Sequence, residues 1–134
     1  MTIIEYISKL KTCSQKNEEQ LMEKVNLSPS ELKGIMVIFP GEKILCNEFS
    51  KRMNLSISRS SRVIEKLVSN GYLNEKKNKE DKRATILSIT PKGKNIKKKI
   101  NISNMECEKK ITSHLNSNEV EDIKKYLQKL LEIL

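Results

Sequence analysis

Apolar residues recur three or four positions apart through most of this chain, which is the spacing of one face of an α-helix. Residues 2–25 follow this pattern at the N-terminus. At the other end, Thr90 and Pro91 form a typical helix start, and a break at residues 116–118 separates that long helix from a last one over residues 119–134. The sequence therefore predicts amphipathic helices at both ends of the chain.

The centre of the chain predicts three shorter helices. The first covers residues 31–39 and carries Phe39 inward, and the second covers residues 48–53 behind an Asn47 cap. The third covers residues 56–70, with a serine as its N-terminal cap. Only a tight turn separates the second helix from the third, which is typical of a helix-turn-helix.

An alternation of apolar and polar residues replaces the helical spacing after these three helices. Gly71 fits the left-handed position that ends a helix. Residues 72–76 and 85–89 then predict two strands, joined by a highly charged turn over residues 78–82. A helix-turn-helix followed by such a hairpin predicts a winged helix-turn-helix, in a mostly α fold with an α+β wing. This is the shape of a protein that places one helix in a DNA major groove.

The length of 134 residues suits one domain. We expect a single domain over residues 1–134, in which a winged helix-turn-helix over residues 28–90 lies between helices of residues 2–25 and 92–134. These outer helices are more apolar than a lone winged helix needs, and they could pack on their own chain or on a second copy. We favour a homodimer, because the last helix has a broad apolar face and little left in its own chain to cover it.

The chain carries a net charge of +9, with 26 lysines and arginines against 17 acidic residues. This charge favours a polyanionic partner such as nucleic acid, although lysine-rich surfaces are also common for reasons of solubility. No apolar run approaches the roughly 18 residues that a membrane span needs. The N-terminus also lacks the basic segment of a signal peptide, so we expect a cytoplasmic protein without membrane contact.

Residues that would support catalysis or metal binding are scarce. The chain has one histidine, His114, which argues against a histidine-based metal centre or a Ser-His-Asp triad. The three cysteines are far apart in sequence and match neither a CxxC zinc site nor a disulfide framework. A glycine-rich phosphate loop is also absent from the sequence. We therefore expect no enzymatic activity, no metal and no cofactor.

The helix predicted over residues 56–70 has an outward face that is rich in hydroxyls and cations. Serine can bond phosphate oxygens or base edges, and arginine can bind guanine in a bidentate way. A solvated helix face would also be polar, but two arginines three positions apart with no acid before Glu65 favour DNA contact. The candidate DNA-binding residues of this helix are Ser56, Ser58, Arg59, Ser61, Arg62 and Lys66.

The tip of the predicted hairpin is the second candidate DNA contact. Its cations could enter a minor groove, where the negative potential is strongest over narrow A·T-rich tracts, although a charged tip is also common because it is solvated. Asp81 and Arg83 would share a face of one strand, so the carboxylate could fix the direction of the guanidinium. The candidates are Lys79, Asp81, Lys82 and Arg83.

Four stretches of this chain resemble the MarR family (multiple antibiotic resistance regulator) of winged helix-turn-helix transcription factors. They are LSPSEL, NEFSKRMNLS, VIEKLVSNGYL and DKRATILSITPKG, and the last is the most diagnostic. The resemblance is close from Leu27 to Lys94 and holds only as a pattern at both ends. It implies a homodimer with dimerisation helices from both termini. It also implies pseudo-palindromic operators and repression that a small ligand or cysteine oxidation relieves.

By position, the resemblance assigns DNA contacts to the serines and arginines of the recognition helix and to Arg83 in the wing, with Asp81 as its partner. The sequence departs from the family in two places. Ser60 lies on the inward stripe, where the family usually has an apolar residue, and this would loosen the helix packing slightly. The N-terminus is short, which trims the first helix and would alter the ligand crevice of the family.

Cys13 has two interpretations. In peroxide-sensing members of the family a cysteine in the first helix is the sensor, and Lys9, Lys11 and Lys16 lie near Cys13 in sequence and would favour its thiolate. Its position on the apolar stripe instead suggests a small buried hydrophobe. Cys13 is therefore a candidate redox sensor, with a packing role as the alternative.

Together these features predict a sequence-specific DNA-binding transcriptional regulator that acts as a repressor and is released by a small ligand or an oxidant. Its expected partners are double-stranded DNA with a pseudo-palindromic operator, a second copy of the chain and a small-molecule effector. The alternative is a protein-interaction winged helix, or an antirepressor that does not itself read DNA. The steep salt dependence of DNA binding would distinguish the two.

Overall fold

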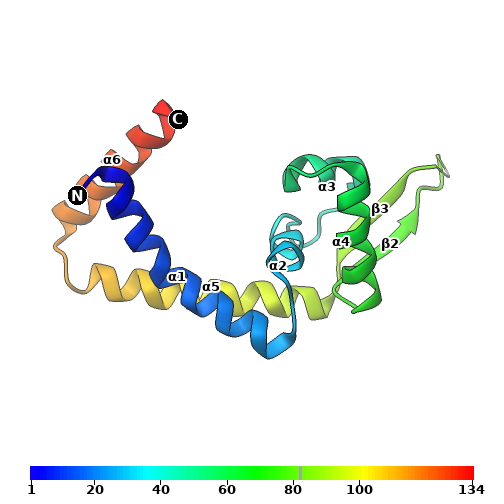
Figure 1. The fold of residues 1–134 in the computed structure, drawn as a ribbon, viewed down its shortest axis with the longest axis horizontal. Helices are drawn as coiled ribbons and strands as arrows, with labels where there is room; N and C mark the ends of the chain where they lie inside the picture. Colours follow the sequence, from blue (N-terminus) through cyan, green and yellow to red (C-terminus); the bar gives the residue numbers. More distant parts are fainter. Residues whose placement is uncertain (82) are drawn as a thin grey trace. The chain divides into compact units, whose positions relative to one another are not determined.

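The computed structural model of the protein describes residues 1–81 and 83–134, apart from the side chain of Cys13. Helices and a small sheet follow one another in the predicted order, so the fold is mostly α with an α+β wing. In chain order the elements are α1 (Ile3–Val25), α2 (Pro29–Met36), β1 (Ile44–Leu45), α3 (Cys46–Met53), α4 (Ile57–Ser69), β2 (Leu73–Lys77), β3 (Thr85–Ile89), α5 (Pro91–Thr112) and α6 (Ser117–Ile133) (Figure 1).

The chain forms two compact units. Residues 15–100 make up the winged unit, and residues 1–14 together with 101–134 make up the terminal unit. In the winged unit, α2 and α3 pack against α4, and the sheet packs against α3 and α4. Burial of apolar surface between these elements drives the folding of this unit. Its most deeply buried side chains are Ile35, Ile38, Phe49, Ser60, Leu67, Leu73 and Leu87.

The turn between α3 and α4 is built from two local devices. Asn54 ends α3 in the left-handed region with a φ of 54°, a conformation that asparagine adopts more readily than most residues. Ser56 then starts α4, because its Oγ accepts the backbone N–H of Arg59 at 3.3 Å. Phe49 and Met53 of α3 are buried and hold α3 against its neighbours. The predicted helix-turn-helix is therefore confirmed.

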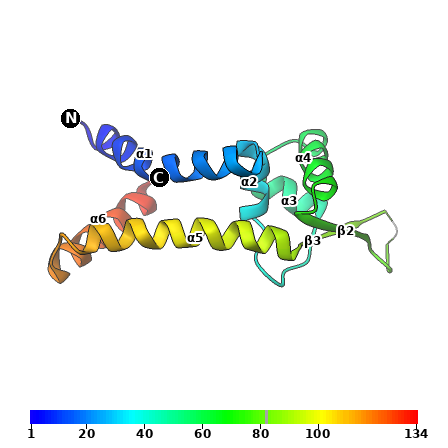
Figure 2. The ribbon, with the colours of Figure 1, turned by 90° about the horizontal axis from the view of Figure 1, so that it is seen from below.

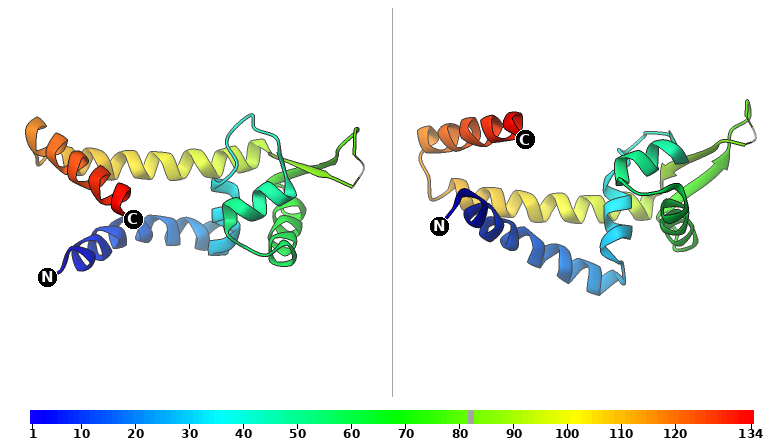
Figure 3. Two further views of the ribbon diagram at one scale, coloured as in Figure 1. Left: turned by 90° about the horizontal axis from the view of Figure 1, so that it is seen from above. Right: turned by 45° about the horizontal axis from the view of Figure 1, so that its top comes forward.

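The strands form a three-stranded antiparallel sheet in the spatial order β1, β3, β2. Leu73 pairs with Ile89 and Ile44 pairs with Leu87, and all four side chains are buried. They define the inner face of the sheet, which packs against α3 and α4. The hairpin of β2 and β3 projects beyond these helices as the predicted wing (Figure 2, Figure 3).

The start of α5 lies too close to the sheet to leave room for a side chain. A Cβ atom at Gly93 would stand 2.5 Å from the carbonyl oxygen of Tyr72 and 2.6 Å from Cγ1 of Ile89. The Oγ1 of Thr90 bonds to the carbonyls of Gly71 and Tyr72 and accepts the N–H of Gly93 at 3.1 Å. These contacts fasten the first turn of α5 to the junction between α4 and β2.

One predicted boundary is wrong at the end of the first central helix. α2 ends at Met36 rather than at residue 39, with Val37 at its C-cap. The helical spacing no longer applies beyond this point, so Ile38 is fully buried in place of Phe39. The predicted inward position of Phe39 is therefore wrong, because its side chain is 64% exposed.

Two other helices begin earlier than predicted. α3 begins at Cys46, so Asn47 lies in its first turn rather than before it. α6 begins at Ser117, because Asn116 and Glu119 form a capping box in which each side chain accepts the other residue's backbone N–H.

Two cations from different helices bind the carbonyl groups at the end of α2. Lys97 of α5 donates from Nζ to the carbonyls of Met36, at 3.3 Å, and of Ile38. Arg52 of α3 donates from Nη1 to the carbonyl of Val37 at 2.8 Å. The last carbonyls of a helix have no partner within it and carry partial negative charge, so cations stabilise this end. Lys97 is only 8% exposed in this position.

Glu42 completes what we call the cation cluster, which consists of Arg52, Lys97 and Glu42. Its carboxylate accepts an N–H of Arg52 at 2.7 Å and the backbone N–H of Phe39 at 2.9 Å. The hydrogen bonds from Arg52 and then from Phe39 lower the pKa of Glu42 to about 2. Burial lowers the pKa of Lys97, and the charge of Glu42 opposes that effect. The ring of Phe39 lies 5.8 Å from Cζ of Arg52 and 5.4 Å from Nζ of Lys97.

A second lysine of α5 binds the end of α4. Lys92 donates from Nζ to the carbonyl of Asn70, the C-cap of α4, at 2.7 Å, and its Nζ lies 4.6 Å from the centre of the Tyr72 ring. Since Lys92 and Lys97 both belong to α5, this helix contacts the C-terminal ends of both α4 and α2.

In the terminal unit, apolar side chains of α1, α5 and α6 are left uncovered. None of the 17 residues of α6, all of them described, is buried. No helix in the described part of the chain is both long and apolar enough to cross a bilayer. The exposed apolar residues of the terminal unit include Ile3, Ile7, Leu10, Ile102, Met105, Ile111, Ile123, Leu127 and Leu131.

Candidate nucleic-acid interface

α4 has one buried stripe and one exposed face. Ser60, Ile64 and Leu67 are buried and Val63 packs against the core, whereas the polar residues between them point to solvent. All six residues of this helix and its cap that the sequence singled out are exposed. They are the cap Ser56 and the five residues that we call the cationic face of α4, namely Ser58, Arg59, Ser61, Arg62 and Lys66.

The cations of this face form no ion pair with a described carboxylate. Among the described residues, the ion pairs belong to Arg52, and none involves Arg59, Arg62 or Lys66. The first turn of α4 also contains no acidic residue, and a helix N-terminus carries partial positive charge of its own. The first half of α4 therefore presents cations that form no ion pair with the described residues.

The serines of the cationic face differ in what they can still bind. Ser61 donates from Oγ to the carbonyl of Ile57 at 2.9 Å, so its hydroxyl hydrogen is already used. Its lone pairs remain and suit a donor such as the amino group of adenine or cytosine. Ser58 lies with its Oγ 3.3 Å from that of Ser56. One of these two hydroxyls can donate its hydrogen to the other, which leaves the second hydroxyl hydrogen free to be donated to a phosphate.

A groove between α4 and the start of α2 was not predicted. Arg59, Arg62 and Lys66 line it on one side, and Ser28, Ser30 and the buried Glu31 line it on the other. The sequence marked Ser28 only as a helix cap, and its Oγ does accept the N–H of Glu31 at 3.2 Å. No local pattern indicates that the start of α2 lies beside α4, because that proximity comes from the packing of the helices.

The described candidate residues of the wing tip lie in solvent. Lys79, Asp81 and Arg83 are exposed, whereas Lys82 lies outside the described residues. The contact between Asp81 and Arg83 differs from the predicted one, because the carboxylate accepts the backbone N–H of Arg83 at 3.0 Å and forms no ion pair with its guanidinium. The reason is that β3 begins only at Thr85, so both residues belong to the turn.

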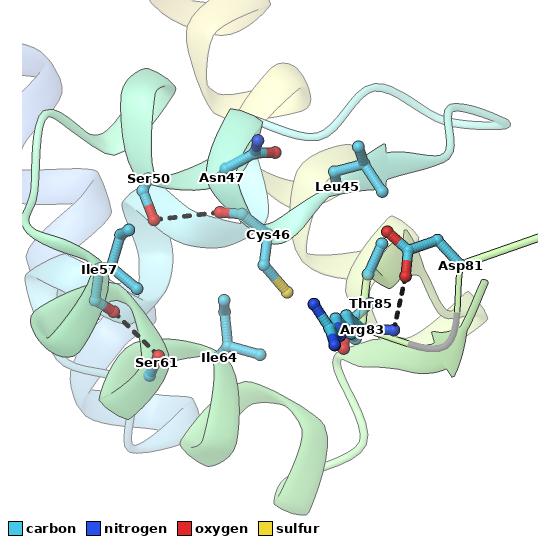
Figure 4. A pocket seen from close by; sticks show the side chains of 11 residues that line it. Leu45, Cys46, Asn47, Ser50, Ile57, Ser61, Ile64, Asp81, Arg83 and Thr85 are labelled. Carbon is cyan, nitrogen blue, oxygen red and sulfur yellow. Dashed lines mark hydrogen bonds between the residues drawn. The ribbon is translucent and has the colours of Figure 1, made fainter.

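Residues from α3, α4 and the wing line a common cleft with a volume of about 330 Å³ (Figure 4). Ser61 of α4 and Asp81 and Arg83 of the wing all border it, so the two predicted contact regions meet there. Cys46 points its sulfur into the cleft. Burial, and to a smaller extent the charge of Glu75, raises the pKa of the Cys46 thiol, so this cysteine stays protonated at neutral pH.

Ser60 carries a buried hydroxyl without a visible partner. Its side chain is 1% exposed, and its Oγ forms no hydrogen bond with any described residue. A buried polar group that makes no hydrogen bond costs about 1–3 kcal/mol relative to a satisfied one. The departure noted in the sequence therefore has a structural counterpart inside α4.

The remaining candidate chemistry is limited. The side chain of Cys13 lies outside the described residues, and Cys107 is half-buried on α5. In the described part of the chain, no group of three histidine, cysteine, aspartate or glutamate side chains could hold a metal ion.

Comparison with known sequences gives two likenesses. A family described as a winged helix DNA-binding domain matches residues 27–93 of this chain. The HTH-type transcriptional regulator BilQ of Clostridium symbiosum is 30% identical over 96 residues, which cover 70% of this chain and 67% of BilQ.

Comparison with solved structures shows the fold. The superposition on the reduced form of MarR from E. coli covers 98% of this chain and 97% of that MarR chain, at 19% sequence identity and a TM-score of 0.75. A mutant of S. aureus MepR covers 98% of both chains at 16% identity and a TM-score of 0.78. A mutant of E. coli MarR in complex with operator DNA matches 95% of this chain and 91% of its own, at 20% identity and a TM-score of 0.68. The predicted winged helix fold is confirmed by these likenesses.

Proposed function

Because the chain belongs to the winged helix DNA-binding family and is a transcriptional regulator of the MarR type, we propose that it binds an inverted-repeat operator as a homodimer, through the cationic face of α4 and the wing. One observation carries this proposal. Arg59, Arg62 and Lys66 are exposed on one face of α4 without a carboxylate partner in the described part of the chain. The phosphates of a duplex supply the missing negative charge.

In this proposal α4 enters the major groove with its first half against the base edges. Arg59 and Arg62 donate to guanine O6 and N7, and Ser61 accepts from an amino group. Lys66 binds phosphate together with Ser28 and Ser30 across the groove between α4 and α2.

The wing makes the second contact of the proposal. Lys79 and Arg83, with Lys82 between them in sequence, enter the adjacent minor groove, where the negative potential of narrow A·T-rich tracts attracts cations. Asp81 orders the backbone of the tip by accepting the N–H of Arg83. Ser61 and Arg83 border the same cleft, which supports one continuous DNA-binding surface.

The terminal unit, together with the adjoining parts of α1 and α5, supplies the dimer interface in this proposal. Residues 2–25 and 92–134 act as dimerisation helices, and residues 28–90 form the DNA-binding part of a single domain over residues 1–134. The support is the set of uncovered apolar side chains on α1, α5 and α6, since burial of apolar surface contributes about 25 cal/mol per Å². Two copies of α4 would then meet half-sites about 34 Å apart, which is one turn of the duplex.

The proposal extends to repression that a small ligand or an oxidant relieves. Lys92 and Lys97 of α5 bond to the ends of α4 and α2, so a displacement of α5 would move both helices. An effector that prefers the displaced arrangement would shift the population away from the one whose α4 spacing fits the operator. Cys13 is the candidate for oxidation, and the raised pKa of Cys46 disfavours that cysteine.

Selection of bound sequences from random duplex DNA at two salt concentrations tests this function. We expect an inverted repeat to be recovered at both salt concentrations. The protein should also elute as a dimer in size-exclusion chromatography. Binding should weaken linearly with the logarithm of the salt concentration. Recovery of no sequence above background would contradict the proposal. In that case an antirepressor or protein-interaction role would explain the basic surface better.

A further inference from the structure

The outer face of the three-stranded sheet is hollowed and lined by lysines. Lys43, Lys76, Lys77 and Lys79 border this hollow, which has a volume of about 420 Å³, and Asn74 and Ser88 contribute polar groups to it. We call it the outer groove. Asn74 pairs with Ser88 in the register, and their side chains alternate with those of Leu73 and Ile89 on the inner face. The outer groove is therefore on the opposite side of the sheet from the core.

The charge of the outer groove is not balanced by its own chain. Four lysines line it against one acidic residue, Glu80. Within residues 1–81 and 83–134 none of these lysines forms an ion pair, although Arg52 of the same unit forms two. These four lysines border one hollow, where the positive potential of each adds to that of the others.

We propose that the outer groove binds the phosphate backbone of DNA that flanks the operator, beyond the half-site contacted by α4. This inference rests on the proposed function, and it assigns a role to Lys43, Lys76 and Lys77, which lie outside the cationic face of α4 and the wing tip.

The geometry favours a duplex as the occupant. The groove is continuous with the wing tip, because Lys79 belongs to both. Lys43 precedes β1 and Lys76 lies on β2, at opposite edges of a sheet with β3 in the middle, so the two edges are about 9–10 Å apart. Lysines at that separation can reach several phosphates, since duplex DNA carries a negative charge about every 1.7 Å along its axis. In the outer groove, the side-chain amide of Asn74 and the hydroxyl of Ser88 can donate hydrogen bonds to phosphate oxygens.

The test compares two duplexes that carry the same inverted repeat, recovered by the selection described above. One ends at the repeat, and the other extends by about ten base pairs on each side, one turn of B-DNA. The double variant Lys43→Gln/Lys76→Gln is compared with wild type and with Lys98→Gln/Lys99→Gln. This control removes the same charge from exposed lysines of α5.

Wild type and the control variant should bind the long duplex more tightly than the short one, with a steeper salt dependence. The groove variant should lose that gain and bind the short duplex like wild type. Its salt slope on the long duplex should fall by about 0.9 for each lost phosphate contact. Equal affinities of wild type for the two duplexes would overturn the proposal, as would an equal loss by the groove variant on both. Failure of wild type to bind either duplex would instead contradict the proposed function.

Discussion

The winged unit contains two groups of cations that differ in their partners. Arg52 and Lys97 are turned into the protein, where they bind Glu42 and the carbonyls at the end of α2. Arg59, Arg62 and Lys66 are exposed on α4 and form no ion pair with any described residue. The same residue types thus serve two purposes. The paired cations hold helices together, and the unpaired cations are left for a ligand.

This difference leads to separable expectations for stability and for DNA binding. Removing an unpaired, exposed cation should change binding and leave the free energy of unfolding almost unchanged, since surface substitutions usually stay within about 0.5 kcal/mol. Removing a buried, hydrogen-bonded cation should change the free energy of unfolding and leave the binding of the folded protein intact.

The largest effect is expected from Arg62→Ala. If Arg62 reads a guanine, the variant should lose about 1–3 kcal/mol of operator binding and discriminate less at that base pair. Its urea unfolding midpoint should match that of wild type, because Arg62 forms no ion pair among the described residues. Fluorescence anisotropy with the operator and with single-base variants measures both effects. Unchanged operator affinity would remove Arg62 from the interface.

Lys97→Met should act in the opposite way. It leaves the carbonyls of Met36 and Ile38 without their donor, and it should lower the free energy of unfolding by about 1–2 kcal/mol. The matched control is Lys98→Met, which removes the same charge from an exposed neighbour and should leave the stability unchanged. Urea unfolding of both variants is the measurement, and equal stabilities would show that Lys97 contributes no more than a surface lysine.

The cation cluster should also make stability depend on pH. The pKa of Glu42 is lowered to about 2 from its ordinary 4.5, so its ionised form stabilises the folded state above pH 4.5. That contribution should be lost as the pH falls from 4.5 towards 2. Wild type should therefore lose more stability over this window than Glu42→Gln does. Parallel pH profiles of the two proteins would show that the Arg52–Glu42 contact does not contribute.

Ser60→Ala should have a smaller effect with the opposite sign. The hydroxyl of Ser60 is shielded from solvent and forms no hydrogen bond with any described residue. The variant therefore removes an unsatisfied hydroxyl, and its free energy of unfolding should rise by up to about 1 kcal/mol. Thermal unfolding measures the gain, with Ser61→Ala as an exposed control. A loss of stability in Ser60→Ala would mean that the hydroxyl is bonded in solution.

The features that the sequence predicted correctly are local ones. Ser56 caps α4 through an N–H three residues away, and Gly71 adopts left-handed backbone after the end of α4, so a short window of sequence contains the information. The strand β3 over residues 85–89 follows from its own alternation. The outward face of α4 follows from its helical period in the same way.

The features that were missed depend on contacts between distant segments. Lys97 binds the carbonyl of Ile38, 59 residues away in sequence, and no periodicity relates the two. Phe39 looked like the next position of an apolar stripe, but the helix had already ended at Met36. The groove between Ser28 and Arg62 likewise exists only once α2 has packed beside α4.

The most direct test of the distinction between paired and unpaired cations is a salt titration of operator affinity for Lys66→Met and Lys97→Met. Both variants exchange a lysine for methionine and lose the same charge, but Lys66 is exposed and Lys97 is buried. Lys66→Met should make the slope of log K against log salt shallower by about 0.9 per protomer, and Lys97→Met should keep the slope of wild type. Equal changes of slope in the two variants, or a change only in Lys97→Met, would contradict the distinction.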